Sequence, residues 1–451
     1  MSDQGYCTGE IVESQTMFEK IFDEAVSSHS SICFYGPTGT GKTKMLMRLY
    51  TELRKKNKVK ITSLTARGAV RFRKELGEGK TLTRLSGVGT SENENIVSAM
   101  DYLASEISET DILLIDDVSL MNQSVFEKIH NCFCQKRNEY KKPFGGVRLI
   151  IAGDTYMTSS DEFPRFFESY IWDKCAFVTY ELTNSFRYDA KSQHWFDMLL
   201  RIRCGTVIDS DLEKIKELVA DENEVNLRLQ EYWKDNETHG TTEFIMYICT
   251  RKDEVKSHND EQLRKIENSE IIPLEAHDEV PESEKIKNIL TVKLDNEIDK
   301  IIEMKIGATV VTTRNQSNIP SGTVGVVKQI SDDTVTIVVT NSKKEIEIKR
   351  CSYDVEYEDE KETYYAKRLQ FPITLGYATT IQKVLGIEFE NAVISLKELW
   401  LEGYFYTALS RVKNYKNITL LLPPYFSIRS FIKNSSRNGE AFNKLINLNQ
   451  D

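Results

Sequence analysis

Long hydrophobic runs are absent from this sequence, and none approaches the roughly 20 apolar residues that span a bilayer. The opening residues Met-Ser-Asp-Gln-Gly form neither the apolar core of a secretory signal nor a basic transit segment. We therefore expect an intracellular protein, of the cytoplasm or nucleus, that has no membrane partner.

Paired cysteines are also absent. The chain has eight cysteines, but no two of them stand in a C-x-x-C pair. That spacing is typical of zinc ribbons, and regular sets of cysteines are typical of secreted disulfide frameworks. The sequence predicts free thiols in a reducing compartment instead.

Excess positive charge is missing from the chain as a whole, whose formal net charge is −10. A general polyanion-binding domain usually has a pI above about 9, so this class is disfavoured. The average hides an asymmetry, because residues 42–74 contain twelve Lys or Arg and a single acid, whereas residues 354–362 contain six acids and one Lys. The basic stretch is compatible with contact to a phosphate backbone or with a solvated helix face, and the sequence leaves both open.

The 451 residues, of which 40% are hydrophobic, are enough for two large domains and an insertion. In the first 185 residues, short apolar runs alternate with amphipathic stretches, a pattern typical of a parallel α/β sheet. The predicted strands are residues 32–35, 59–64, 112–115, 147–152 and 176–182.

A weaker alternation follows, with apolar runs at 244–248, 391–396 and 418–422 and a helical stretch at 403–412. Between them lie short β-rich runs with Gly or Asp turns, at 308–311, 322–330, 334–340 and 344–349. We therefore expect an α/β fold with a first domain at 1–185, a second at 186–295 and 365–451, and a small β-barrel inserted at 296–364.

A complete phosphate-binding loop stands in the first domain, between a predicted strand and a stretch with helical spacing. It reads Gly-x4-Gly-Lys-Thr and consists of Gly36, Pro37, Thr38, Gly39, Thr40, Gly41, Lys42 and Thr43. In such loops the backbone amides cradle the phosphates, the lysine reaches the β and γ oxygens, and the threonine ligates Mg²⁺. The sequence predicts a site for ATP and Mg²⁺.

Carboxylates follow two of the predicted strands. Asp116 is placed to orient the metal, and Asp117 is placed to polarise the attacking water as general base, although a strand-end turn rich in Asp is the alternative. Asp154 follows the next strand, at the sheet edge where ligands bind. It either senses the nucleotide through water or caps the following turn, and the sequence leaves both open.

Further segments occur in a characteristic order: TLTRLSGVG at 81–89, LTNSFR at 182–187, LGYATTIQKVLG at 375–386 and YTALSR at 406–411. Together with the phosphate loop, they resemble superfamily 1 helicases of the B branch, most closely the petite-integration-frequency (PIF) DNA helicases, with the RecD-like enzymes next. The resemblance spans almost the whole chain. The segment at 81–89 is the most family-specific signal of the first half.

The resemblance implies two RecA-like P-loop NTPase domains in tandem, with the small barrel in the second and a small wedge-like insertion near residues 85–105. It implies that Gln15 reads the adenine and that Arg187 and Arg411 reach the γ-phosphate from across a domain cleft. Hydrolysis in that cleft would then drive a monomeric motor 5′ to 3′ along single-stranded DNA and into tailed duplexes, in replication, repair or recombination.

Candidate DNA contacts are the polar residues Thr65, Arg84, Thr250, Thr380 and Lys383, which suit phosphates or sugars along a channel. The aromatic residues Phe72, Trp195 and Tyr377 could stack bases, but each is expected in the core.

The chain departs from the family pattern at positions that couple nucleotide to DNA. Asp117 replaces a Glu, Met157 and Leu385 each replace a Gln, and Gln382 replaces a His. We expect an ATPase that DNA still stimulates but whose coupling differs from the family norm. Two alternatives to a helicase remain: a translocase that does not separate strands, and a nucleotide-switched nucleic-acid-binding protein.

Overall fold

The protein is described by a computed structural model at residues 7–88, 105–157, 164–228, 245–358, 362–397 and 403–423, and at 427, 428 and 432; positions 268, 315, 317, 318, 320 and 341 are not described. Its internal contacts define two compact units, one of Met1–Val225 with Ile381–Asp451 and one of Asn226–Thr380. The predicted domain boundaries at 185, 295 and 364 stay a prediction.

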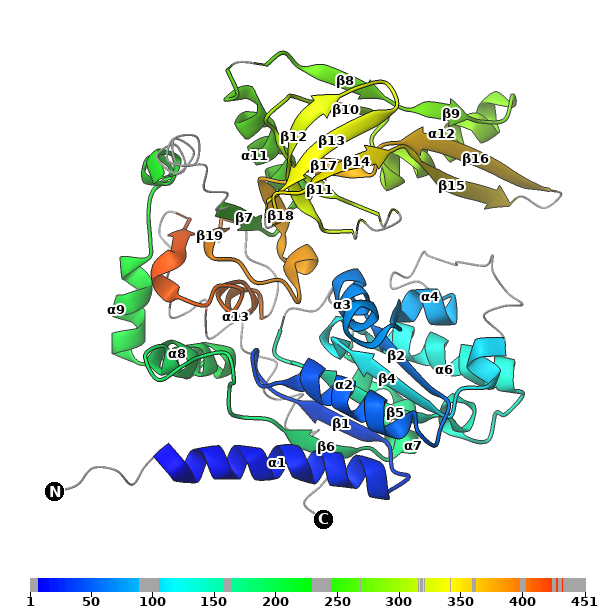
Figure 1. The fold of residues 1–451 in the computed structure, drawn as a ribbon, viewed down its shortest axis with the longest axis vertical. Coiled ribbons are helices and arrows are strands. Elements are labelled where there is room, and N and C mark those ends of the chain that lie inside the picture. The colour runs from blue at the N-terminus through cyan, green and yellow to red at the C-terminus, as the bar shows by residue number, and fades with distance from the viewer. Residues whose placement is uncertain are drawn as a thin grey trace. The chain divides into compact units, whose positions relative to one another are not determined.

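The first unit is built on a six-stranded sheet in which every neighbouring pair is parallel (Figure 1). In spatial order its strands are β3 (Lys80–Thr81), β2 (Val59–Ser63), β4 (Ile112–Asp116), β5 (Arg148–Gly153), β1 (Ile32–Tyr35) and β6 (Val178–Glu181). The five predicted strands are confirmed. Strand β3 was not predicted, because two residues are too short to show a periodic pattern.

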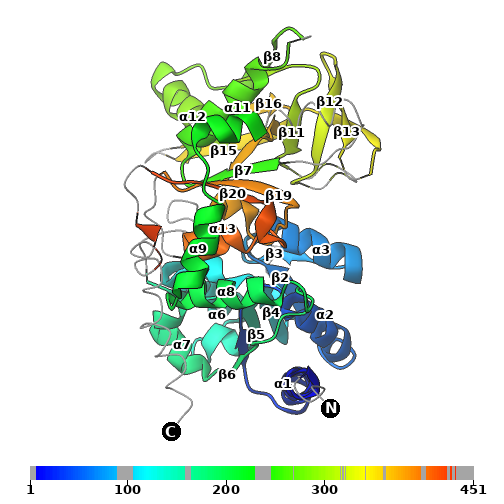
Figure 2. The ribbon, with the colours of Figure 1, turned by 90° about the vertical axis from the view of Figure 1, so that its left-hand side faces the viewer.

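Helices cover both faces of this sheet. They are α1 (Cys7–Ser27), α2 (Lys42–Leu53), α3 (Ala66–Leu76), α4 (Leu82–Ser86), α6 (Gln123–Arg137) and α7 (Tyr170–Cys175), with short 3₁₀ turns at Val118–Leu120, Pro143–Gly146 and Phe166–Glu168. In Figure 2, α1, α2 and α3 lie on one side of the sheet and α6 and α7 on the other.

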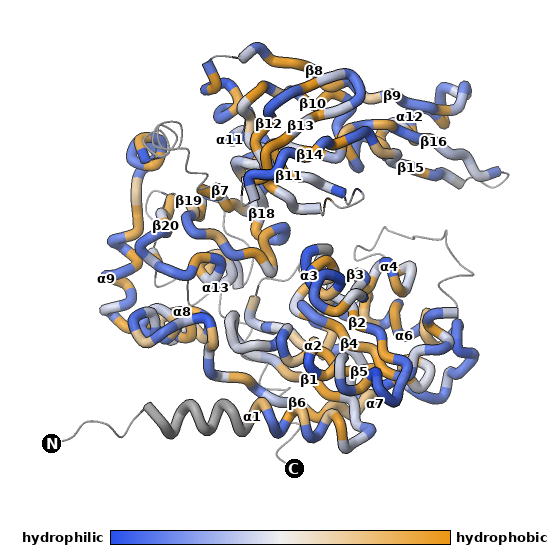
Figure 3. The backbone as a smooth tube through the Cα atoms, viewed as in Figure 1, coloured by the Kyte–Doolittle hydropathy of each residue, from blue (hydrophilic) through white to orange (hydrophobic). Residues whose placement is uncertain are grey.

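Strand β4 shows why both faces need cover. Ile112 and Leu114 pack into one hydrophobic cluster with α2, whereas Leu113 and Ile115 pack into another with α6. Successive strand residues point to opposite faces, so a continuous apolar run indicates a strand buried on both sides. In Figure 3, β4 and its neighbour β5 in the sheet are coloured largely as hydrophobic.

The first unit also contains elements from beyond residue 185. These are α8 (Gln193–Cys204), α9 (Asp209–Glu217), the 3₁₀ turns Ile381–Val384 and Tyr415–Asn417, β19 (Asn391–Ser395), α13 (Tyr404–Leu409) and β20 (Ile418–Leu421). Strands β19 and β20 pair in parallel. The strands and the helix predicted in this region are therefore present.

The second unit contains β7 (Ile245–Cys249), which pairs in parallel with β18 (Ala378–Thr380), and an antiparallel five-stranded sheet. The order of that sheet is β14 (Glu345–Lys349), β13 (Thr334–Val339), β12 (Val324–Ile330), β11 (Thr309–Thr312) and β17 (Ile373–Leu375). The remaining elements are α11 (Lys252–Arg264), β8 (Ile272–Glu275), β9 (His277–Glu279), α12 (Glu284–Glu297), β10 (Ile301–Met304), β15 (Cys351–Glu358) and β16 (Thr363–Gln370). Strands β11 to β14 of that sheet are the strands predicted in the insertion, whereas β17 was not predicted and lies beyond it. That the insertion is a barrel stays a prediction.

No helix among the described residues is both long enough and apolar enough to cross a membrane.

Candidate nucleotide site

The phosphate loop connects β1 to α2, and its glycines are required by geometry. Gly39 and Gly41 have φ angles of 83° and 84°, in the left-handed region that side chains disfavour. At Gly36 a Cβ atom would stand 2.2 Å from the carbonyl oxygen of Leu182. The predicted order of strand, loop and helix is present, and the N-terminus of α2 faces the loop.

Lys42, the first residue of α2, folds over the loop. Its Nζ donates hydrogen bonds to the carbonyl oxygens of Gly36 at 2.7 Å and Pro37 at 2.6 Å. Burial lowers the pKa of Lys42 to about 8, against the opposing effect of the Asp154 and Asp116 carboxylates. The ammonium group is therefore held at the loop, where it can meet phosphate oxygens.

Thr43 and Asp116 form the predicted metal pair. Thr43 donates from Oγ1 to Oδ2 of Asp116 at 2.7 Å, and Asp116 ends strand β4 with only 3% of its surface exposed. Burial, and after it the charge of Asp117, raise the pKa of Asp116 to about 7. A hydroxyl and a carboxylate side by side are hard oxygen donors, so these residues fit Mg²⁺.

Asp117, the predicted base, has φ 59° and ψ 34°. Its Oδ2 accepts hydrogen bonds from Thr65 Oγ1 at 2.8 Å and from Ser63 Oγ at 3.2 Å. A predicted DNA contact, Thr65, and the predicted base are thus direct hydrogen-bond partners, a pairing that the sequence analysis did not predict.

Both predicted arginines meet the phosphate loop at Thr38. Arg187 donates from Nη1 to Thr38 Oγ1 at 2.7 Å, and Arg411 donates from Nη2 to the same oxygen at 3.5 Å. Arg411 is 2% exposed, and burial together with the charge of Arg187 lowers its pKa. Arg187 also pairs with Glu388 at 2.6 Å. Two cations directed at one point of the loop form a preorganised site for an anionic oxygen.

Asp154 lies in a buried network in which two residues had no predicted role. Arg203 donates to its Oδ1 at 3.1 Å, and Tyr406 donates from Oη to its Oδ2 at 2.6 Å. Tyr406 Oη in turn accepts the backbone N–H of Thr38 at 3.2 Å. Burial raises the pKa of Tyr406 well above its ordinary value, and Asp154 acts in the same direction, so the phenol stays a donor. A chain of hydrogen bonds therefore joins the phosphate loop to α13, Asp154 and α8.

Neither earlier interpretation of Asp154 describes this network. The backbone N–H of Tyr156 does donate to Asp154 Oδ1, at 3.3 Å, so the carboxylate also caps its turn. Met157 is buried, and its side chain has no polar atom that could join the hydrogen bonds. Tyr406 lies in a segment that carried the helicase resemblance. Asp154 is 252 residues from Tyr406 and 49 from Arg203, so no local pattern marks either residue as its partner.

The remaining predicted site residues are spread over both units. Arg84 and Lys383 are exposed in the first unit, where Thr65 is half-buried. In the second unit, Thr250 directly follows β7, and Thr380 ends the paired strand β18 with 7% of its surface exposed. Their role in binding DNA stays a prediction.

Some predictions concern residues that the structure does not describe. The side chain of Gln15, on α1, lies outside the described part, as do residues 89–104 of the predicted wedge. By contrast, the expected core positions of Phe72, Trp195 and Tyr377 are confirmed, because none exceeds 5% exposure.

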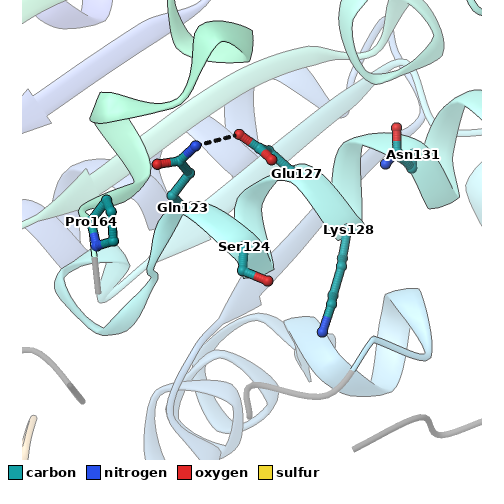
Figure 4. A pocket seen from close by; sticks show the side chains of 6 residues that line it. All are labelled: Gln123, Ser124, Glu127, Lys128, Asn131 and Pro164. Carbon is teal, nitrogen blue, oxygen red and sulfur yellow. Dashed lines mark hydrogen bonds between the residues drawn. The ribbon is translucent and has the colours of Figure 1, made fainter. Parts of the chain in front are cut away.

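A separate polar hollow lies against the start of α6 (Figure 4). It is lined by Gln123, Ser124, Glu127, Lys128, Asn131 and Pro164. Gln123 and Ser169 both donate to Glu127, at 2.9 Å and 2.7 Å. None of the predicted site residues lines this hollow.

Comparison with known proteins agrees with the site. Residues 11–214 match the sequence model of the PIF1-like helicase family. The chain is 26% identical over 409 residues to the ATP-dependent DNA helicase Pif1 of Bdellovibrio bacteriovorus, covering 88% of this chain and 85% of that protein. It is 25% identical over 419 residues to ATP-dependent DNA helicase PIF1 of Homo sapiens, and there it spans 59% of the relative's length.

Solved structures show the same fold. The Pif1 helicase from Candida albicans aligns with a TM-score of 0.74 at 22% identity, over 95% of this chain and 98% of that one. Bacteroides Pif1 in complex with ADP-AlF3 and ssDNA aligns with a TM-score of 0.73 at 21% identity, over 97% of each chain. The resemblance to PIF-type helicases is therefore confirmed, as is the α/β fold with a parallel sheet.

Proposed function

We propose that this protein, which resembles PIF1-like helicases in sequence and Pif1 structures in fold, hydrolyses ATP at the phosphate loop and uses that energy to unwind DNA. We further propose that it moves 5′ to 3′ on single-stranded DNA and separates tailed duplexes. It acts inside the cell as a single-chain motor, since both arginines at the loop come from the same chain as Lys42.

The observation that carries this proposal is the meeting of Arg187 and Arg411 at Thr38. These arginines follow Thr38 in the sequence by 149 and 373 residues. A protein that only bound a nucleotide would need the loop but not two distant cations directed at it. A motor needs them, because charge stabilisation at the transferred phosphoryl group speeds hydrolysis and links it to the segments that carry the arginines.

The tandem arrangement is part of the proposal. Residues 1–185 would be one RecA-like domain, residues 186–295 and 365–451 a second, and residues 296–364 a small barrel inserted into it. The parallel sheet of the first unit, the parallel pairs β7–β18 and β19–β20, and the antiparallel sheet at β11–β14 and β17 support this assignment.

Each residue at the loop then has a chemical task. Lys42 binds the β and γ oxygens, and Thr43 and Asp116 would hold Mg²⁺, which would supply charge neutralisation at the phosphates. In hydrolysis a water oxygen bonds to the γ-phosphorus, the bond to the bridging oxygen breaks, and ADP leaves. The water proton passes to Asp117, while Arg187 and Arg411 stabilise the charge on the transferred group.

The two alternatives are a translocase that does not separate strands and a nucleotide-switched binding protein. ATP hydrolysis measured with and without single-stranded DNA distinguishes a motor from the binding protein. A motor predicts hydrolysis that rises severalfold with DNA and is lost in Lys42→Ala. A nucleotide-switched binding protein predicts tight binding of ATP and DNA with negligible turnover. Hydrolysis that ignores added DNA would contradict the proposed coupling.

A further inference from the structure

The predicted base, Asp117, is held from one side by two hydroxyls. A non-glycine residue seldom adopts a positive φ, and Asp117 adopts one, 59°, immediately after the buried strand β4. Its Oδ2 accepts from Thr65 and from Ser63, at 2.8 Å and 3.2 Å. Within the described residues Oδ1 of Asp117 accepts no hydrogen bond, so this oxygen is left for a water molecule.

The Thr65 hydroxyl has a second task. It is the N-cap of α3, where its Oγ1 accepts the backbone N–H of Gly68 at 3.1 Å. A hydroxyl has one proton and two lone pairs, so it can cap the helix and donate to Asp117 at the same time. The backbone N–H of Thr65 donates to Ser63 Oγ at 3.1 Å, which leaves the Ser63 proton for Asp117. Every donor in this small network therefore has an acceptor.

The network is packed against the first turn of α3 with no free space. A Cβ atom on Gly68 would stand 2.2 Å from Ser63 Oγ and 3.0 Å from Thr65 Oγ1. Since interiors so tightly packed shift as units, a displacement of the helix start moves both donors to Asp117.

We propose that Thr65 is a positioning residue for ATP hydrolysis, which orients Asp117 through its hydroxyl and transmits contact of DNA with the start of α3 to the base. This inference rests on the proposed function, in which Asp117 accepts the water proton. An aspartate is one methylene shorter than a glutamate, so its reach depends more strongly on the orientation of its carboxylate group. The two hydrogen bonds that Oδ2 of Asp117 accepts fix this orientation.

The test uses Thr65→Val, which keeps the shape and removes the hydroxyl, and Thr65→Ser, which keeps the hydroxyl. We expect Thr65→Val to lower kcat about tenfold at saturating single-stranded DNA, with KM for ATP unchanged within about twofold, because orientation of a base is part of its contribution of about 10²-fold or more. Thr65→Ser should retain most of the wild-type kcat. Asn122→Ala is the matched control, because it removes the equivalent cap of α6, in which Asn122 Oδ1 accepts from Val125 N at 2.8 Å, and among the described residues Asn122 makes no hydrogen bond to Asp117.

A double-mutant cycle shows whether Thr65 acts through Asp117. In an Asp117→Asn background, Thr65→Val should slow hydrolysis less than twofold further, since the base it orients is already gone. An equal loss in both backgrounds would overturn the inference, as would a Thr65→Val variant that weakens DNA binding yet keeps the wild-type kcat at saturation.

Results that contradict the proposed function differ from those that contradict the role of Thr65. If DNA does not stimulate hydrolysis by the wild type, the proposed motor and the transmission through α3 are both contradicted. The effect of Thr65→Val on the kcat measured without DNA then still tests whether Thr65 orients Asp117. A wild-type chain that hydrolyses no ATP would overturn both, because Asp117 would then have no reaction to serve.

Discussion

The Tyr406 hydroxyl is the smallest group whose removal tests the arrangement at the phosphate loop. It donates to Asp154 at 2.6 Å, accepts from Thr38 N at 3.2 Å, and belongs to a side chain that is 2% exposed. In Tyr406→Phe the bond to the carboxylate is lost and the N–H of Thr38 is left buried without a partner. A hydrogen bond to a charged group contributes about 1.5–3 kcal/mol, and an unsatisfied buried donor costs about 1–3 kcal/mol.

We expect the free energy of unfolding of Tyr406→Phe to fall by about 2–4 kcal/mol, since relaxation recovers part of that sum. Thr38 also receives both arginines, so a shift of the loop should lower kcat at least about tenfold, which equals about 1.4 kcal/mol. Urea unfolding and steady-state ATP hydrolysis measure the two effects.

Tyr404→Phe is the matched control. Tyr404 lies on the same short helix and is fully buried, and its hydroxyl donates to the carbonyl oxygen of Ser395 at 3.1 Å instead of to the nucleotide site. Its removal should cost about 1 kcal/mol of stability and leave kcat unchanged. The reasoning is refuted if Tyr406→Phe is no less stable than Tyr404→Phe and hydrolyses ATP at the wild-type rate.

Three further predictions concern charged groups. Lys42→Ala should abolish hydrolysis and movement together, while nucleotide-free binding of single-stranded DNA, measured by fluorescence anisotropy, survives; a loss of DNA binding would show that Lys42 supports the fold. Arg411→Lys should lower kcat about 10²-fold with little change in ATP affinity, because the ammonium cannot reproduce the guanidinium fork, and an unchanged kcat would remove Arg411 from the site. Asp278→Asn should reduce the free energy of unfolding by about 2 kcal/mol, because fully buried Arg368 loses one of its two carboxylate partners, held at 2.7 Å and 2.8 Å, and keeps Asp295. Hydrogen bonding to Arg368 lowers the pKa of Asp278, so this contribution is complete above the ordinary pKa of 3.8 and is lost as the pH falls through the folded value; equal pH profiles for wild type and variant would contradict it.

The parts of this protein that sequence predicts well are those set by local patterns. Strand β4 is a continuous apolar run that ends in two aspartates, and the loop before Lys42 needs glycine at fixed positions. Both can therefore be predicted from the local sequence alone. The arginines at 187 and 411 were placed only by their order among resembling segments, and both now lie at Thr38.

What sequence could not supply is the pairing of distant side chains. The partners Asp154 and Tyr406 are 252 residues apart, and Tyr406 lies on a helix outside the sheet. Thr65 and Asp117 are 52 residues apart and meet because the parallel strands β2 and β4 end at the same edge of the sheet. The replacement of a Gln by Met157 led us to expect coupling that differs from the family norm, and this stays a prediction. The structure shows a tyrosine from α13 linking the loop to Asp154, a contact that no spacing rule predicts.

The central claim is that hydrolysis at the phosphate loop drives directional strand separation. Single-turnover unwinding, started by adding ATP and trap strand to protein bound to a 5′-tailed duplex, a 3′-tailed duplex or a blunt duplex, tests it most directly. The account predicts displacement of the 5′-tailed substrate alone, and none with Lys42→Ala. Displacement of only the 3′-tailed substrate would contradict the polarity, and hydrolysis with no displacement of any substrate would contradict the helicase itself.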